Sequence, residues 1–453
     1  MKSVAFHNLG CKVNGYEMDY MQQNLQQRGY ILVPFDTKAD IYIINTCSVT
    51  NVADRKSRQM IHRARKRNPD AIVVAVGCYV QTSPKEVLED LSIDIAIGNN
   101  RKKDIVNIIE EYIQQCEKQH SGMTEEQKKS FSEKTIIDIN HTDEYEDMQL
   151  SHTAEHTRAF LKVQDGCNQF CSYCIIPYAR GRIRYREIED VVREAAELAG
   201  NGYQEIVLTG IHLSSYGMER GNDFTQSRLL ELVKSVNAVE GIKRIRLGSL
   251  EPRIITSGFA QGLAQCEKLC PHFHLSLQSG CDTVLKRMNR KYTTKEYYEK
   301  VQLLREVFDL PAITTDVIVG FPMESEEEFA QTEEFLRKVQ FYEMHIFKYS
   351  KRKGTPAATM EGQVPDEVKT LRSNRLLKQN EEMSRAFRER YLGKQVEILL
   401  EEEMMLEGVR YQTGYTREYV RVGMPTQEDL SGKVLTGTLE RFLSKDMLLV
   451  FSS

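Results

Sequence analysis

The segment AFLKVQDGCNQFCSYC, residues 159–174, joins a run typical of a buried strand to three closely spaced cysteines. Cys167, Cys171 and Cys174, here called the core triad, place three thiolates on one tight loop. Three thiolates can ligate three irons of a [4Fe-4S] cluster, whereas ordinary electron-transfer clusters use four cysteines. The fourth iron would have no protein ligand and could bind a small molecule, just as a catalytic zinc ion keeps one coordination position open for substrate. A structural zinc loop is the alternative, but the closest histidines, His152 and His156, precede the strand.

Strand-like and helix-like segments alternate after this loop. Strand candidates lie at 205–210, 244–249, 272–277, 313–320 and 344–350, and helical segments at 190–199, 294–307 and 326–339 separate them. Together with 159–166 they make six βα repeats, which predict a full or partial β/α barrel over residues 151–383. Its working face should be the carboxyl ends of the strands.

A second α/β series precedes the loop, over residues 1–115. Apolar runs at 4–10, 41–46 and 72–77 alternate with helical stretches at 16–27 and 53–67, which indicates a doubly wound parallel sheet. Cys11, Cys47 and Cys78, here called the N-terminal triad, each follow one of these runs. The carboxyl ends of parallel strands share one edge, so we expect a second three-thiolate site there. The alternative is three small buried side chains.

Two further regions complete the chain. Residues 116–150 are polar and charged and are expected to form a linker or a solvated excursion. After a charged helix at 367–391, short alternating segments predict a small β-barrel over residues 384–453. The expected fold class is therefore α/β, with a doubly wound N-terminal domain, a full or partial central barrel and a small C-terminal β-barrel.

Composition restricts the class of protein. A length of 453 residues exceeds one ordinary core, and 41% hydrophobic with 28% charged residues is typical of a soluble globular chain. No apolar run has the length of a membrane span, and the N-terminus lacks the features of a secretory signal, so we expect a cytoplasmic protein with no membrane partner. Ten cysteines are too few for a disulfide scaffold, and Cys116, Cys266, Cys270 and Cys281 are interpreted as structural or incidental.

The cysteine motifs carry a family resemblance. CNQFCSYC after the first barrel strand resembles the radical S-adenosylmethionine (SAM) superfamily. Nearly the whole chain resembles the radical SAM methylthiotransferase family. The motifs that carry this resemblance are LGCKVN around Cys11, INTCSVT around Cys47 and VGCYVQ around Cys78, followed downstream by LTGIHLSSYG, LGSLEP, HLSLQSG and DVIVGFP. The resemblance implies two [4Fe-4S] clusters on the two triads, SAM at the open iron of the core triad, and a C-terminal TRAM domain. It also implies SAM contacts from Tyr173, Gly210, Ser249, Glu251 and Gln278, and we nominate no catalytic acid or base.

The family's reaction uses SAM twice. One SAM methylates a sulfur on the N-terminal cluster, and another gives an adenosyl radical that activates the target carbon. The resemblance thus implies an electron donor such as flavodoxin or ferredoxin and a source of sulfur. LGCKVN followed by Tyr16-Glu17 resembles the branch that modifies N6-threonylcarbamoyladenosine at tRNA position 37. The alternatives are methylthiolation of N6-isopentenyladenosine in tRNA or of a ribosomal-protein aspartate, and, in another class, a non-catalytic iron–sulfur protein that binds RNA or senses redox state.

Three groups of basic or aromatic residues are candidates for contact with tRNA. Arg180, Arg182, Arg184 and Arg186 alternate along the segment after the core triad, and an extended backbone would aim them to one side as a row for phosphates. The basic run at 55–67 fits either RNA contact or a solvated helix face. In the C-terminal tail, arginine and tyrosine could stack on unpaired bases, at Arg410, Tyr411, Tyr415, Arg417, Tyr419 and Arg421.

Overall fold

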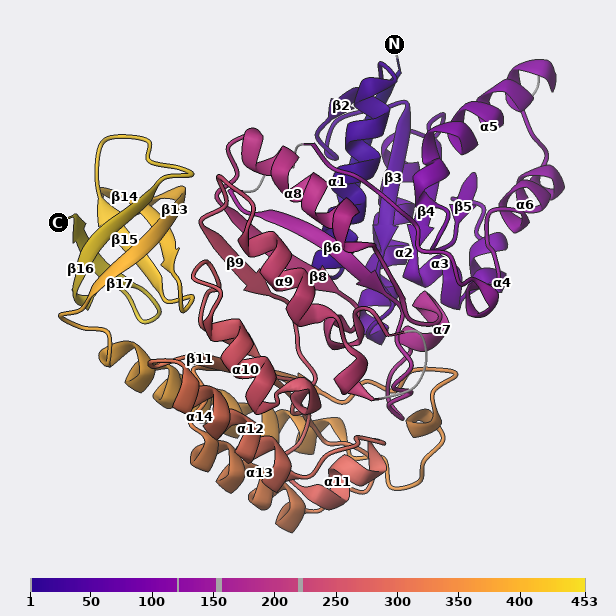
Figure 1. Ribbon diagram of the computed structural model, residues 1–453. Helices are drawn as coiled ribbons and strands as arrows, with labels where there is room; N and C mark the ends of the chain where they lie inside the picture. The colour runs from indigo at the N-terminus through magenta and orange to yellow at the C-terminus, as the bar shows by residue number, and fades with distance from the viewer. Residues whose placement is uncertain (1, 120–121, 152–156, 219–222, 453) are drawn as a thin grey trace.

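The computed structural model describes residues 2–119, 122–151, 157–218 and 223–452 (Figure 1). The N-terminal domain is a parallel sheet in the order β2-β1-β3-β4-β5, formed by Ile31–Val33, Ser3–Asn8, Ile41–Thr46, Ile72–Gly77 and Ile95–Ile97. Alternate strand residues pack against α1 (Lys12–Gln27) and α5 (Ile105–Gln119) on one face, and against α2 (Asn51–Arg67) on the other. The sheet is therefore doubly wound, as predicted. The short helices α3 (Cys78–Thr82) and α4 (Pro84–Leu88) follow β4.

The segment expected to be a solvated linker is packed instead. It contains α6 (Glu125–Glu133), and Phe131 and Ile139 are buried. The hydroxyl of Ser132 accepts a hydrogen bond from the amide of Ala96 in β5 (3.0 Å), and the amide of Gly98 donates to the carbonyl oxygen of Thr135 (3.0 Å). The polar composition misled the prediction, because these residues satisfy the edge of the N-terminal sheet with hydrogen bonds and bury few side chains.

The central domain is a partial barrel of parallel strands. One sheet has the order β7-β6-β8-β9, from Arg184–Tyr185, Ala159–Asp165, Glu205–Gly210 and Arg244–Leu247, in which only β7 is antiparallel. The other is β10-β11-β12, from His272–His274, Ala312–Val319 and Glu343–Lys348. Isolated bridges from Ile245 to Leu269 and from Leu250 to Leu275 connect the two sheets. Within the described residues no pairing joins β12 to β6, so the barrel is open on that side.

Helices cover the outside of this partial barrel. They are α7 (Ile176–Arg180), α8 (Ile188–Gly200), α9 (Leu229–Asn237), α10 (Ser257–Ala264), α11 (Asp282–Arg287), α12 (Thr294–Val307), α13 (Glu326–Val339) and α14 (Asp366–Glu389). Capping boxes begin α12, at Thr293 and Glu296, and α13, at Ser325 and Glu328. These pairs satisfy amide groups that the first helical turn leaves without partners. No helix in the described ranges is both long and apolar enough to cross a bilayer.

The C-terminal domain is a closed barrel in the order β13-β14-β15-β17-β16, formed by Gln395–Leu406, Val409–Thr416, Arg421–Pro425, Leu448–Ser452 and Val434–Phe442. The boundary expected between residues 383 and 384 falls inside α14, and the barrel begins only at Gln395. Figure 1 shows this barrel and the N-terminal domain on either side of β6, β8 and β9.

Candidate active site

The loop that carries the core triad is fixed by its own backbone. Gly166 has φ +73°, and a Cβ added there would lie 1.8 Å from the carbonyl oxygen of Arg182, so only glycine fits. The amide of Cys167 donates to the carbonyl oxygen of Gly181 (3.1 Å). Asn289 Nδ2 donates to the carbonyl oxygen of Phe170 (2.9 Å). Hydrogen bonds from other segments therefore fix the loop at Cys167 and at Phe170.

The thiols of the core triad have the environment of metal ligands. Burial raises the pKa of Cys167, and it raises the pKa of Cys174 to about 12, with the neighbouring thiols adding to both shifts. Nη1 of Arg290 donates to Sγ of Cys171 (3.3 Å), and the amide of Gln169 donates to Sγ of Cys167 (3.5 Å). Three enclosed thiols with hydrogen-bond donors fit an iron–sulfur cluster, because a bound metal replaces the thiol protons and donors tune the ligand sulfurs.

The fold also brings together the N-terminal triad. Cys11 is the N-cap of α1, Cys47 follows β3, and Cys78 is the first residue of α3. At Gly10, with φ +114°, an added Cβ would lie 3.1 Å from Sγ of Cys47. Burial, with a smaller contribution from the thiols of Cys78 and Cys11, raises the pKa of Cys47 to about 11. Three cysteines that are distant in sequence thus form a second three-thiolate set.

A buried ion-pair network, here called the Glu17 network, lies between the two triads. Glu17 of α1 pairs with Lys102, with Lys162 of β6 (2.8 Å) and with Arg180 of α7. Arg180 also contacts Asp165 (3.3 Å), two residues before the core triad. These cations hold the pKa of Glu17 well below its usual range despite burial. The network fixes the N-terminal domain against the central barrel.

The expected row of arginines for phosphate contact is wrong in three of its four members. Arg180, Arg184 and Arg186 are at most 2% exposed, and each is held by a carboxylate or a backbone carbonyl. Arg186, for example, pairs with Asp147 (2.9 Å) and Glu194 (2.5 Å). Arg182 alone is exposed, and its guanidinium lies 4.7 Å from the centre of the Phe170 ring. Arg180 lies in α7 and Arg184 in β7, a short edge strand paired with β6, so the four arginines do not form one extended row.

The expected SAM contacts other than Tyr173 lie at or just after the ends of barrel strands. Glu251 is 3% exposed and pairs with Arg290 (3.1 Å) and Arg253 (2.8 Å). Against the effect of burial, Arg290, His212 and Arg253 hold the pKa of Glu251 at about 2. Gln278 has φ +74° after β10, Gly210 ends β8, and Ser249 follows β9. Tyr173 packs edge-on against Phe321, with ring centres 6.4 Å apart. Arg290 was not predicted, because no motif marks it; it connects Glu251 with Cys171.

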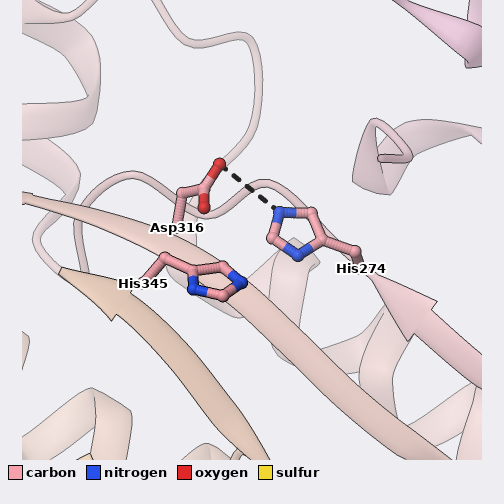
Figure 2. A group of neighbouring side chains, drawn as sticks. All are labelled: His274, Asp316 and His345. Atoms are coloured by element: carbon pink, nitrogen blue, oxygen red, sulfur yellow. Dashed lines mark ion pairs between the residues drawn. The ribbon is translucent and has the colours of Figure 1, made fainter. Parts of the chain in front are cut away.

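A cavity of about 380 Å³ lies where the three domains meet. Its lining includes Lys12 of α1, His272 and His274 of β10, and Tyr419 of the C-terminal domain. Figure 2 shows His274, Asp316 and His345 converging from β10, β11 and β12, with His274 Nε2 3.4 Å from Asp316 Oδ2. Sequence reasoning missed this cavity, although Lys12 and His274 stand inside quoted motifs.

Comparison with known proteins identifies the family. Residues 3–98 match the family described as "Uncharacterized protein family UPF0004", and residues 161–336 match the radical SAM superfamily. The Threonylcarbamoyladenosine tRNA methylthiotransferase MtaB of Bacillus subtilis is 41% identical over 96% of this chain and 93% of its own length. This chain belongs to the radical SAM methylthiotransferase family. Membership implies SAM and a [4Fe-4S] cluster, as the Cys-x3-Cys-x2-Cys loop predicted.

This methylthiotransferase is also similar to a second group of tRNA-modifying relatives and to solved structures of other radical SAM enzymes. The tRNA-2-methylthio-N(6)-dimethylallyladenosine synthase of Acetivibrio thermocellus is 33% identical over 96% of this chain and 88% of its own length. Among solved structures, the radical SAM methyltransferase TsrM of Kitasatospora setae has a TM-score of 0.58 at 16% identity, covering 79% of this chain and 75% of its own. At that identity the similarity concerns the fold alone.

The C-terminal residues expected to contact RNA mostly dock the methylthiotransferase's own domains. Tyr415 and Tyr419 stack with ring centres 4.4 Å apart, and Arg158 of the central domain lies 5.1 Å from the Tyr419 ring. Arg417 Nη2 donates to the carbonyl oxygen of Leu269 (2.8 Å). Arg410 and Arg421 pair with acidic neighbours on the barrel, and Tyr411 is buried. These six residues therefore do not form a free RNA-binding face.

Proposed function

We propose that this chain converts N6-threonylcarbamoyladenosine at tRNA position 37 to its 2-methylthio derivative. The observation that carries the choice of substrate is the difference in similarity between two groups of relatives. Three proteins named threonylcarbamoyladenosine tRNA methylthiotransferase are 38–41% identical, whereas the proteins named tRNA-2-methylthio-N(6)-dimethylallyladenosine synthase are 33–34% identical. Membership in this transferase family argues against the non-catalytic alternative.

Two [4Fe-4S] clusters are part of the proposal, one on each triad. Each site offers three cysteine thiols, and three ligands would leave one iron of a cluster without a protein ligand. When bound, the clusters and SAM supply reducing electrons, an adenosyl radical and the sulfur and methyl group that are transferred. SAM would contact Tyr173, Gly210, Ser249, Glu251 and Gln278.

The chain's own residues contribute position and enclosure. Arg290 donates to the core triad and holds Glu251, so it fixes an acceptor beside the cluster loop. The Glu17 network holds the two triads at a fixed separation and contributes no exposed cation. Rigid placement of this kind is what a reaction between two cofactor-bound groups requires.

The partners follow from this chemistry. They are tRNA, an electron donor such as flavodoxin or ferredoxin, and a sulfur source, and we propose that the protein acts in the cytoplasm. Once the buried arginines are excluded, the candidate positive groups left for phosphates are Arg182 and the exposed basic members of helix α2, which are Arg55, Lys56, Arg58, Arg63 and Lys66. Of these, Arg63 pairs with Asp36 (2.6 Å).

Mass spectrometry of tRNA nucleosides from cells with and without the gene tests the proposal. Deletion should abolish 2-methylthio-N6-threonylcarbamoyladenosine, and expression of the intact gene should restore it. If the isopentenyl derivative disappears instead, the substrate belongs to the other tRNA branch. Unchanged tRNA with a changed mass of a ribosomal protein would point to the third branch.

A further inference from the structure

The cavity at the meeting of the three domains contains a cation that the fold does not neutralise. Arg158 and Arg246 line it, but Arg158 pairs with Glu401 (2.8 Å) and Arg246 with Glu205 (2.6 Å). Lys12 also lines it, with Nζ 5.9 Å from the centre of the Phe160 ring. Among the described residues Nζ has no hydrogen bond or ion pair, and the Lys12 side chain is itself exposed. A positive charge is therefore available on the lining of the cavity.

The other polar groups of the cavity can take part in hydrogen bonds. Nδ1 of His272 is buried without a hydrogen-bond partner in the described part of the chain. His345 is exposed to the cavity, and its ring stacks on that of His274 with centres 5.8 Å apart. Asp316, paired with His274, offers carboxylate oxygens that can accept from N–H or O–H groups. The lining therefore suits a polar ligand with one negative charge.

A metal ion is the other ligand that these side chains could hold. One ligand atom each from His274, Asp316 and His345 lie within 4.8 Å of one another (Figure 2). However, Lys12 has no ion-pair partner among the described residues, and its positive charge disfavours a divalent cation and favours an anion. Burial lowers the pKa of His272 well below its usual value, and the charges of Arg246, Lys12 and Arg158 add to this shift.

We infer that this cavity receives the threonylcarbamoyl group of the substrate and that Lys12 binds its carboxylate. The inference rests on the proposed function, and it assigns a specificity role to a residue of the LGCKVN motif. Asp316 and His345 are placed to bond the carbamoyl and hydroxyl groups. An isopentenyl group has no charge or hydrogen-bonding group, so it could not bond Lys12, Asp316 or His345.

The experiment compares two tRNA substrates with anaerobically reconstituted full-length enzyme. One tRNA carries N6-threonylcarbamoyladenosine, and the other carries its neutral methyl ester. The variants are Lys12→Gln, Lys12→Arg and, as a matched control, Lys38→Gln on an exposed lysine of the same domain. Loss of a charged hydrogen bond should raise KM about 10- to 100-fold with a smaller change in kcat.

The wild-type enzyme and Lys38→Gln should prefer the acid over the ester by that factor. Lys12→Gln should treat the two substrates alike, and Lys12→Arg should restore the preference. Equal KM values for the acid and the ester in the wild-type enzyme would overturn the inference. Because this comparison uses no variant, the test remains valid even if Lys12→Gln loses iron. Failure of the wild type to methylthiolate either tRNA, while it still cleaves SAM, would instead refute the proposed function.

Discussion

Replacing Glu17 with Gln tests whether the Glu17 network holds the two domains together. The carboxylate is 1% exposed, and its partners Lys102, Lys162 and Arg180 are all buried. Lys162 and Arg180 keep Asp165 as a second partner, at 2.7 Å and 3.3 Å. Within the described residues Lys102 has no other carboxylate at ion-pair distance, although the buried Glu146 interacts with it electrostatically, so the change leaves its charge buried without an ion-pair partner.

The magnitude follows from that unpaired lysine. Removing one partner of a buried ion pair costs about 3–5 kcal/mol, and the amide oxygen of Gln can restore about 1 kcal/mol as a neutral acceptor. The expected loss of about 2–4 kcal/mol is a large part of a typical stability of about 5–15 kcal/mol. The double variant Glu17→Gln/Lys102→Met should recover at least half of this loss, because the buried charge is gone.

Urea denaturation of the cluster-free protein measures the effect, followed by far-ultraviolet circular dichroism because the chain has no Trp. Glu110→Gln, which removes an exposed pair with Arg28 (2.8 Å), is the matched control and should have little effect. A Glu17→Gln variant as stable as the control would refute the reasoning. So would a double variant less stable than the single one.

Further predictions concern the clusters, SAM, acid stability and tRNA. Replacing all three cysteines of the N-terminal triad with Ala should remove about half of the bound iron and all methylthio product, while 5′-deoxyadenosine still forms. An iron analysis that shows an unchanged cluster load would contradict the two-site proposal. Arg290→Met should raise KM for SAM about 10- to 100-fold, with partial rescue by Arg290→Lys, because Glu251 loses its partner near the core triad. The pKa values of Glu17 and Glu251 are lower in the folded protein than in the unfolded chain. Their contribution to stability is fully present above the unfolded pKa of about 4.3 and is lost as the pH falls through the folded values. The wild type should therefore lose stability more steeply than Glu17→Gln between about pH 5 and pH 2. Arg182→Ala should weaken tRNA binding and reduce its salt dependence by about one counterion, whereas Arg184→Ala should lower the thermal midpoint, because only the first is exposed.

The acidic and basic residues illustrate why sequence reasoning failed at some positions. Alternation in the sequence grouped Arg180, Arg184 and Arg186, but it could not say that their guanidinium groups face Glu17, Asp165 and Glu194. The partners come from other parts of the chain. Tyr415 and Tyr419 were expected on an RNA surface for the same reason, since the central domain that covers them is far away in sequence.

The sequence by itself predicted the order of domains, the parallel sheets and the core triad, because strand periodicity and the spacing within one loop are local properties. It predicted the N-terminal triad from three matching strand ends. Only the tertiary structure decided which charges are available. Lys12 directly follows Cys11 in the chain, yet its proposed role depends on a cavity that it lines together with strands of the central domain and Tyr419. Burial and pairing are set by residues hundreds of positions apart, and no local pattern records them.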